Sequence, residues 1–78
     1  MINESELLSA LGHAILDENF NIESSTENTE NWDSLGQLGI LATVSKLTGG
    51  KSDLIDEVLT CQTARDLIDI LRKHGIVA

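Results

Sequence analysis

The sequence predicts an all-α fold, a small four-helix bundle with a long loop between its first two helices and a short third helix. Three stretches place apolar residues at helical spacing, and none shows the alternation of a strand. The predicted helices begin at capping patterns or end at glycines. The 78 residues suffice for one modest core, so we expect a single domain over residues 1–78.

The first helix is predicted over residues 4–16. Its apolar face carries Leu7, Leu8, Leu11, Ala14 and Ile15. Asn3 followed three residues later by Glu6 resembles a capping box, which marks the beginning of a helix.

The second helix is predicted over residues 34–48, and Gly49 and Gly50 follow it as a left-handed end. Its apolar arc is broad, so we expect it to be the most buried helix. The last helix is predicted over 63–74, with Thr63 as its cap and Gly75 as its stop. A short helical turn over 53–59, with Ser52 as a candidate cap, precedes it.

Residues 17–33 form a polar connection that is long for so small a domain. We expect Phe20 and Ile22 to pin its near end into the core and Trp32 to pin its far end. Cys61 is predicted to be a small buried side chain, and His13 and His74 to be surface or capping residues.

The net charge of −8 lies entirely before Ser34, because residues 1–33 hold eight acidic residues and no Lys or Arg. Residues 34–78 hold five acidic and five basic residues. This acidity argues against nucleic acid or an anionic membrane as partner. The sequence has no long apolar run, so we expect no membrane insertion. We also expect the protein to be cytoplasmic and a monomer. One cysteine and two histidines make a metal site unexpected.

The segment 31–38 delivers Ser34 from the long loop to the first turn of the second helix. Backbone N–H groups at such a terminus favour a phosphate, and the hydroxyl could be presented to another enzyme. The simpler alternative is a helix cap, with Ser34 and Gln37 as a capping box.

The triplet Asp33-Ser34-Leu35, with the chain length, the acidity and the helix order, resembles the acyl carrier proteins. Residues 59–67 also look like that family's entry into its last helix. The resemblance implies a carrier that is not an enzyme. A phosphopantetheinyl transferase would move 4′-phosphopantetheine from coenzyme A to Ser34. The arm would carry acyl groups as thioesters to acyl-loading and acyl-transfer enzymes of fatty-acid, lipid, polysaccharide or secondary-metabolite biosynthesis.

The same resemblance assigns roles to neighbouring residues. Asp33 would hold the attachment site in shape, and Leu35 would be the exposed apolar contact beside the arm. Helices two and three would form the docking face for partner enzymes. Its residues would be Leu35, Leu38, Ala42, Asp53, Asp56 and Glu57.

Several alternatives stay open from the sequence. An Asp-Ser pair with a glycine two places past the serine, as Gly36 is here, also occurs in D-alanyl carrier proteins. Another alternative is a non-carrier interaction module, in which Ser34 would be only a helix cap. A serine hydrolase built on Ser34 with His13 or His74 lacks a glycine-flanked nucleophile elbow. Gly36 and Gly39 are either tolerated surface glycines or places where a partner or the arm approaches the backbone closely.

Overall fold

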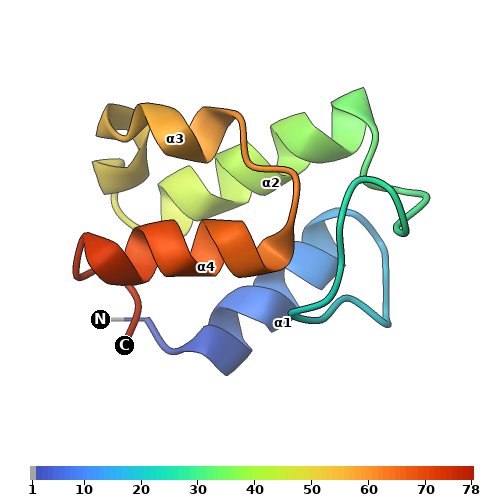
Figure 1. The fold of residues 1–78 in the computed structure, drawn as a ribbon, viewed down its shortest axis with the longest axis horizontal. Helices are drawn as coiled ribbons and strands as arrows, with labels where there is room; N and C mark the ends of the chain where they lie inside the picture. The colour runs from blue at the N-terminus through green and yellow to red at the C-terminus, as the bar shows by residue number, and fades with distance from the viewer. Residues whose placement is uncertain (1) are drawn as a thin grey trace.

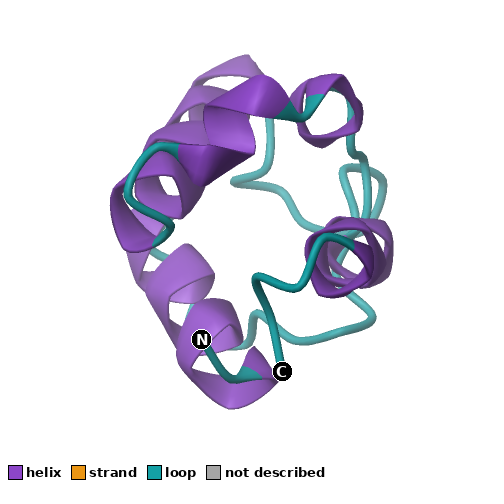
Figure 2. Ribbon diagram, turned by 90° about the vertical axis from the view of Figure 1, so that its left-hand side faces the viewer, coloured by secondary structure: helices purple, strands orange, loops and turns teal. Residues whose placement is uncertain are grey.

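The computed structural model describes residues 2–78, which form four α-helices and one 3-10 helix (Figure 1). The elements are α1 (Glu4–Ala14), α2 (Ser34–Leu47), η1 (Lys51–Leu54), α3 (Asp56–Leu59) and α4 (Ala64–Lys73). Figure 2 shows the helices arranged around a common centre, which the core side chains fill. Within the described residues only two isolated bridges have extended pairing, so the predicted all-α class is confirmed.

The core is formed mainly by α1, α2 and α4. Its fully buried large side chains are Leu7, Leu11, Ile40, Val44, Val58, Leu67, Ile68 and Leu71. Helix α4 buries four of its ten residues, whereas α2 buries three of its fourteen. The expectation that α2 is the most buried helix is therefore wrong. The broad apolar arc of α2 includes Leu35, Leu38 and Leu47, and these three side chains are exposed to solvent instead of buried.

The helix ends follow the predicted caps closely. The side chain of Asn3 accepts a hydrogen bond from the Glu6 N–H at 2.7 Å, and Thr63 accepts one from the Asp66 N–H at 3.0 Å. Gly49 and Gly50 have φ angles of 63° and 85°, as the predicted left-handed ending of α2 requires.

The third predicted helix is not one continuous turn. Ile55, buried and extended at φ −109°, separates η1 from α3. Ser52 is not a helix cap but a buried residue whose N–H donates to the Thr48 hydroxyl at 3.2 Å. Gly50 precedes η1 instead, and it supplies no side-chain cap.

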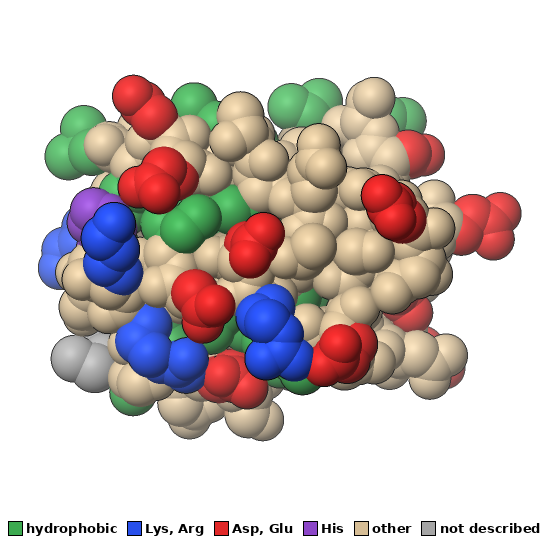
Figure 3. Space-filling view, in the orientation of Figure 1, with side chains coloured by type: hydrophobic (Ala, Val, Ile, Leu, Met, Phe, Trp, Pro, Cys, Tyr) green, Lys and Arg blue, Asp and Glu red, His purple; other side chains and the backbone are tan. Residues whose placement is uncertain are grey.

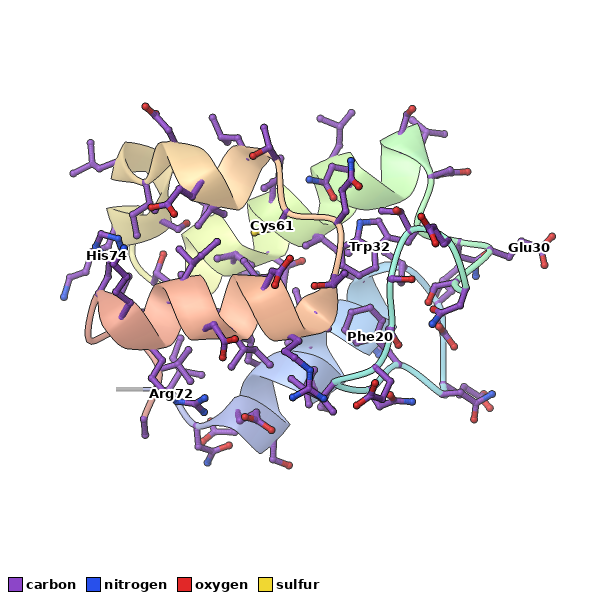
Figure 4. The ribbon with its side chains drawn as sticks, in the orientation of Figure 1. Phe20, Glu30, Trp32, Cys61, Arg72 and His74 are labelled. Atoms are coloured by element: carbon purple, nitrogen blue, oxygen red, sulfur yellow. The ribbon has the colours of Figure 1, made fainter. Side chains whose placement is uncertain are left out.

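The long loop is fixed to the bundle at both ends, as predicted. Phe20 and Trp32 point toward one another (Figure 4), with ring centroids 5.6 Å apart. Trp32 is only 2% exposed, and Phe20 and Ile22 pack against the core. The loop also reaches the start of α4, where the Ala64 N–H donates to the Ser24 carbonyl at 2.8 Å. The loop is therefore an ordered layer over one end of the bundle.

The two ends of the described chain lie side by side (Figures 1 and 2). Ile2 and Val77 form a parallel bridge. The guanidinium of Arg72 binds both the Glu4 carboxylate at 2.9 Å and the Ala78 carbonyl at 3.1 Å. These contacts join α1 to the last residues.

Candidate functional site at the start of α2

Ser34 is the first residue of α2, and it is exposed. The cap is its neighbour Asp33, whose carboxylate accepts the Gly36 N–H at 2.9 Å. Asp33 also supplies the carbonyl that accepts the Gln37 N–H. The capping box predicted for Ser34 and Gln37 is therefore wrong, because Asp33 already accepts hydrogen bonds from the backbone N–H groups of the first turn. The Ser34 hydroxyl takes no part in that cap.

Gln37 has a role other than the predicted cap. Its side-chain oxygen accepts the Trp32 indole N–H at 2.6 Å. Its amide nitrogen donates to the carbonyls of Leu59 and Cys61 at 3.2 and 3.3 Å. Gln37 thus joins the loop, α2 and the connection between α3 and α4. The available signal was a buried tryptophan whose N–H needs an acceptor.

A shallow groove of about 540 Å³ lies beside Ser34. Its walls come from the loop end, the first turn of α2 and the connection from α3 to α4. The lining residues are Thr26, Trp32, Asp33, Ser34, Gln37, Leu59, Thr60, Cys61 and Gln62.

Gly36 is buried beneath the loop rather than open to a partner. A Cβ atom at this position would lie 2.1 Å from the Asn31 carbonyl oxygen. Gly36 is therefore neither a tolerated surface glycine nor an approach route for a partner or an arm, and both expectations for it are wrong. A Cβ at Gly39 would meet only the Ala14 carbonyl, at an ordinary 3.6 Å.

Four exposed leucines lie along α2, η1 and α3. We call Leu35, Leu38, Leu54 and Leu59 the leucine face, with exposed fractions of 78%, 64%, 88% and 51%. Figure 3 shows hydrophobic side chains along the upper edge, where Figure 1 places α2 and α3. The remaining predicted docking residues, Ala42, Asp53, Asp56 and Glu57, are also exposed. Leu54 and Leu59 were not among the predicted docking residues, although both lie within the short helical turn predicted over residues 53–59.

Cys61 is buried beside this site, as predicted. Its thiol donates to the Glu57 carbonyl at 3.2 Å. Burial raises the pKa of the thiol to about 11, and the nearby Asp66 and Glu57 carboxylates add to the rise. A thiol held protonated in this way is a poor nucleophile.

Residues 2–78 hold no group of three or more His, Cys, Asp or Glu side chains arranged to bind a metal ion. The same residues include no helix long and apolar enough to cross a membrane. Both histidines, His13 and His74, are exposed.

The family model described as CbiD, C-terminal domain, matches residues 28–78. The chain belongs to this family. The match covers the end of the long loop and all elements from α2 to α4, and it leaves out α1. No curated protein and no solved structure gives a significant match to the chain.

Membership in the CbiD C-terminal domain family overturns the resemblance to acyl carrier proteins. The family points to cobalamin biosynthesis, so the predicted acyl-carrier function and its place in lipid biosynthesis are wrong. The triplet Asp33-Ser34-Leu35 has a local explanation, because Asp33 caps α2 and Leu35 belongs to the leucine face. Only that resemblance implied a phosphopantetheine arm, its transferase and acyl-transfer partners. Without the resemblance, nothing in the sequence or the fold supports them.

Proposed function

We propose that this chain is a non-catalytic domain of cobalamin biosynthesis that binds a methyltransferase of the CbiD type through its leucine face. Family membership supports the pathway. The exposure of Leu35, Leu38, Leu54 and Leu59 supports the docking role and is the observation that carries it. We further propose that the chain is a monomer before it binds and that it acts in the cytoplasm.

The leucine face supplies the driving force for docking. Burying one leucine side chain is worth about 1.5–3 kcal/mol relative to leaving it exposed. The core is filled by other residues, so burial of the face against a partner requires no rearrangement of the bundle. Four such side chains can offset the entropic costs of association.

Acidic residues border the leucine face and give it a preferred partner. Asp33 stands at the start of α2, and Asp53, Asp56 and Glu57 lie on η1 and α3. A partner surface with Lys or Arg around an apolar centre would complement this pattern. Such charges mainly raise the association rate, so the rate should fall as salt is added.

Three features support a role without catalysis. The one thiol is buried and held protonated. His74 lies at the opposite end of the molecule from the start of α2 (Figure 4). The groove beside Ser34 is shallow, whereas catalytic pockets surround most of a substrate.

Binding of the purified chain to a purified cobalt-precorrin methyltransferase of the CbiD type tests the proposal. Calorimetric titration should show a complex that the double variant Leu35→Ser and Leu38→Ser weakens by about tenfold or more. Leu47→Ser is the matched control, because Leu47 is an exposed leucine of α2 that borders a different groove with α1. Absence of binding by the wild-type chain, or equal losses in both variants, would contradict the proposal.

A chemical test separates the assignment to cobalamin biosynthesis from the overturned acyl-carrier function. The chain is incubated with coenzyme A, Mg²⁺ and a broad-specificity phosphopantetheinyl transferase, and its intact mass is measured. We expect an unchanged mass. A gain of one phosphopantetheine group that disappears in Ser34→Ala would overturn the assignment and restore the carrier function.

A further inference from the structure

Leu16 has an unusual backbone for its residue type. Its φ angle is 57°, and it is the one non-glycine residue with positive φ among residues 2–78. It occupies the position just past the end of α1 where the Asp17 N–H donates to the Gly12 carbonyl at 2.8 Å and the Leu16 N–H donates to the His13 carbonyl. Helices that end in this way normally place glycine there, because a side chain is strained in the left-handed region.

The Leu16 side chain does not recover this strain by burial, since 82% of its surface is exposed. It stands at a groove of about 420 Å³ on the outer side of α1. Leu8 and Phe20, which pack against the core, contribute the apolar part of that groove. The full lining is Leu8, Ser9, Gly12, His13, Leu16, Asp17, Glu18 and Phe20.

Asn31 holds the strained turn in place. Its side-chain amide donates to the carbonyls of Ile15 at 3.0 Å and Leu16 at 3.3 Å. The backbone that carries the exposed leucine is therefore held in place before any partner arrives, which reduces the backbone entropy lost on binding.

The charge at the groove indicates the chemistry of its occupant. Asp17 and Glu18 line it, and residues 1–33 contain no Lys or Arg. A segment with an apolar side chain flanked by Lys or Arg would complement both the groove and its border.

We propose that the groove at Leu16 is a second protein-docking site, which takes an apolar side chain flanked by basic residues from a partner protein. The site lies on α1 and the beginning of the long loop, outside the family match, and its lining shares no residue with the leucine face. It does not depend on which enzyme binds that face.

The probe is a synthetic peptide with one tryptophan between two pairs of lysines. Titration into the ¹⁵N-labelled chain should give saturable NMR shift changes that centre on Leu8, His13 and Leu16. Peptides with glutamate in place of lysine, or alanine in place of tryptophan, should leave these signals unmoved. Shift changes confined to the leucine face, or none at all, would overturn the proposal.

Leu16→Gly separates binding from folding. Glycine is unstrained at this backbone angle, so the Tm should stay level or rise while peptide affinity falls by about tenfold. Leu54→Ala, which truncates an exposed leucine on the other surface, should bind the peptide as the wild type does. Wild-type affinity in Leu16→Gly, or a lowered Tm, would contradict the role given to Leu16.

Discussion

The carbonyl oxygen of Asn31 lies directly against the backbone of Gly36, where a Cβ atom would come within 2.1 Å of it. The side chain of Asn31 reaches the other way and binds the carbonyls of Ile15 and Leu16. One loop residue therefore touches both the end of α1 and the first turn of α2. The start of α2 depends on this close crossing as well as on its own helix-forming residues.

Gly36→Ala should destabilise the protein despite the higher helix propensity of alanine. Propensity alone would add about 1 kcal/mol of stability. The contact with Asn31 is with backbone, which cannot move aside cheaply, so we expect a net loss of about 2 kcal/mol. Urea unfolding measures the change.

Gly39→Ala is the matched control on the same helix. Its Cβ would lie 3.6 Å from the Ala14 carbonyl, an ordinary contact, so this variant should gain stability by up to about 1 kcal/mol. Equal effects of the two substitutions would show that the crossing at Asn31 is not what requires a glycine.

Asp33→Ala should weaken the start of α2, because the carboxylate accepts the Gly36 N–H. We expect a loss of about 1 kcal/mol in the free energy of unfolding. Asp33→Asn should be nearly neutral, since asparagine caps as well as aspartate. Ser34→Ala should also leave the free energy of unfolding nearly unchanged. A larger loss of stability in Ser34→Ala than in Asp33→Ala would show that Ser34, and not Asp33, caps α2.

Gln37→Leu should leave the indole N–H of Trp32 without a hydrogen-bond acceptor. Trp32 is buried, and the side-chain oxygen of Gln37 accepts this N–H in the folded protein. Leaving this donor unpaired should cost about 1–3 kcal/mol. Thermal unfolding monitored by tryptophan fluorescence reports both the loss and the changed surroundings of the indole. Gln62→Leu replaces an exposed glutamine nearby, and it should leave both readouts unchanged.

Stability should fall at high pH because of Cys61. Its pKa rises from an ordinary 9.0 to about 11 in the folded state, first through burial and then through Asp66 and Glu57. Between these values the unfolded chain loses the thiol proton more readily than the folded chain. The free energy of unfolding should therefore decrease as pH rises from 9 to 11, by on the order of 2 kcal/mol.

Urea unfolding at pH 8 and pH 10.5 tests this dependence on Cys61. Cys61→Ala should show a smaller decrease, because it lacks the titrating thiol. Iodoacetamide should alkylate the wild-type thiol slowly until the chain is unfolded. Equal pH dependence in the two proteins would exclude Cys61 as the cause.

Local patterns in the sequence predicted the helices because caps and left-handed endings act within a few residues. Asn3 with Glu6 and Thr63 with Asp66 form the expected bonds, and Gly49 and Gly50 end α2. The end of α1 was predicted two residues late, since Ala14 and Ile15 continue the apolar period. The left-handed turn at Leu16 depends on Asn31, which lies fifteen residues further along the chain.

The all-α class, the number of main helices and the pinning of the long loop by Phe20 and Trp32 could all be predicted from the sequence. Apolar spacing and capping bonds involve residues only a few positions apart, so they can be recognised directly in the sequence. Three features could not be predicted in this way: Gly36 lies beneath Asn31, Gln37 bridges three segments, and the exposed leucines of α2 face solvent. Each of these depends on which distant segment packs against α2, and residue spacing within one helix carries no information about that choice.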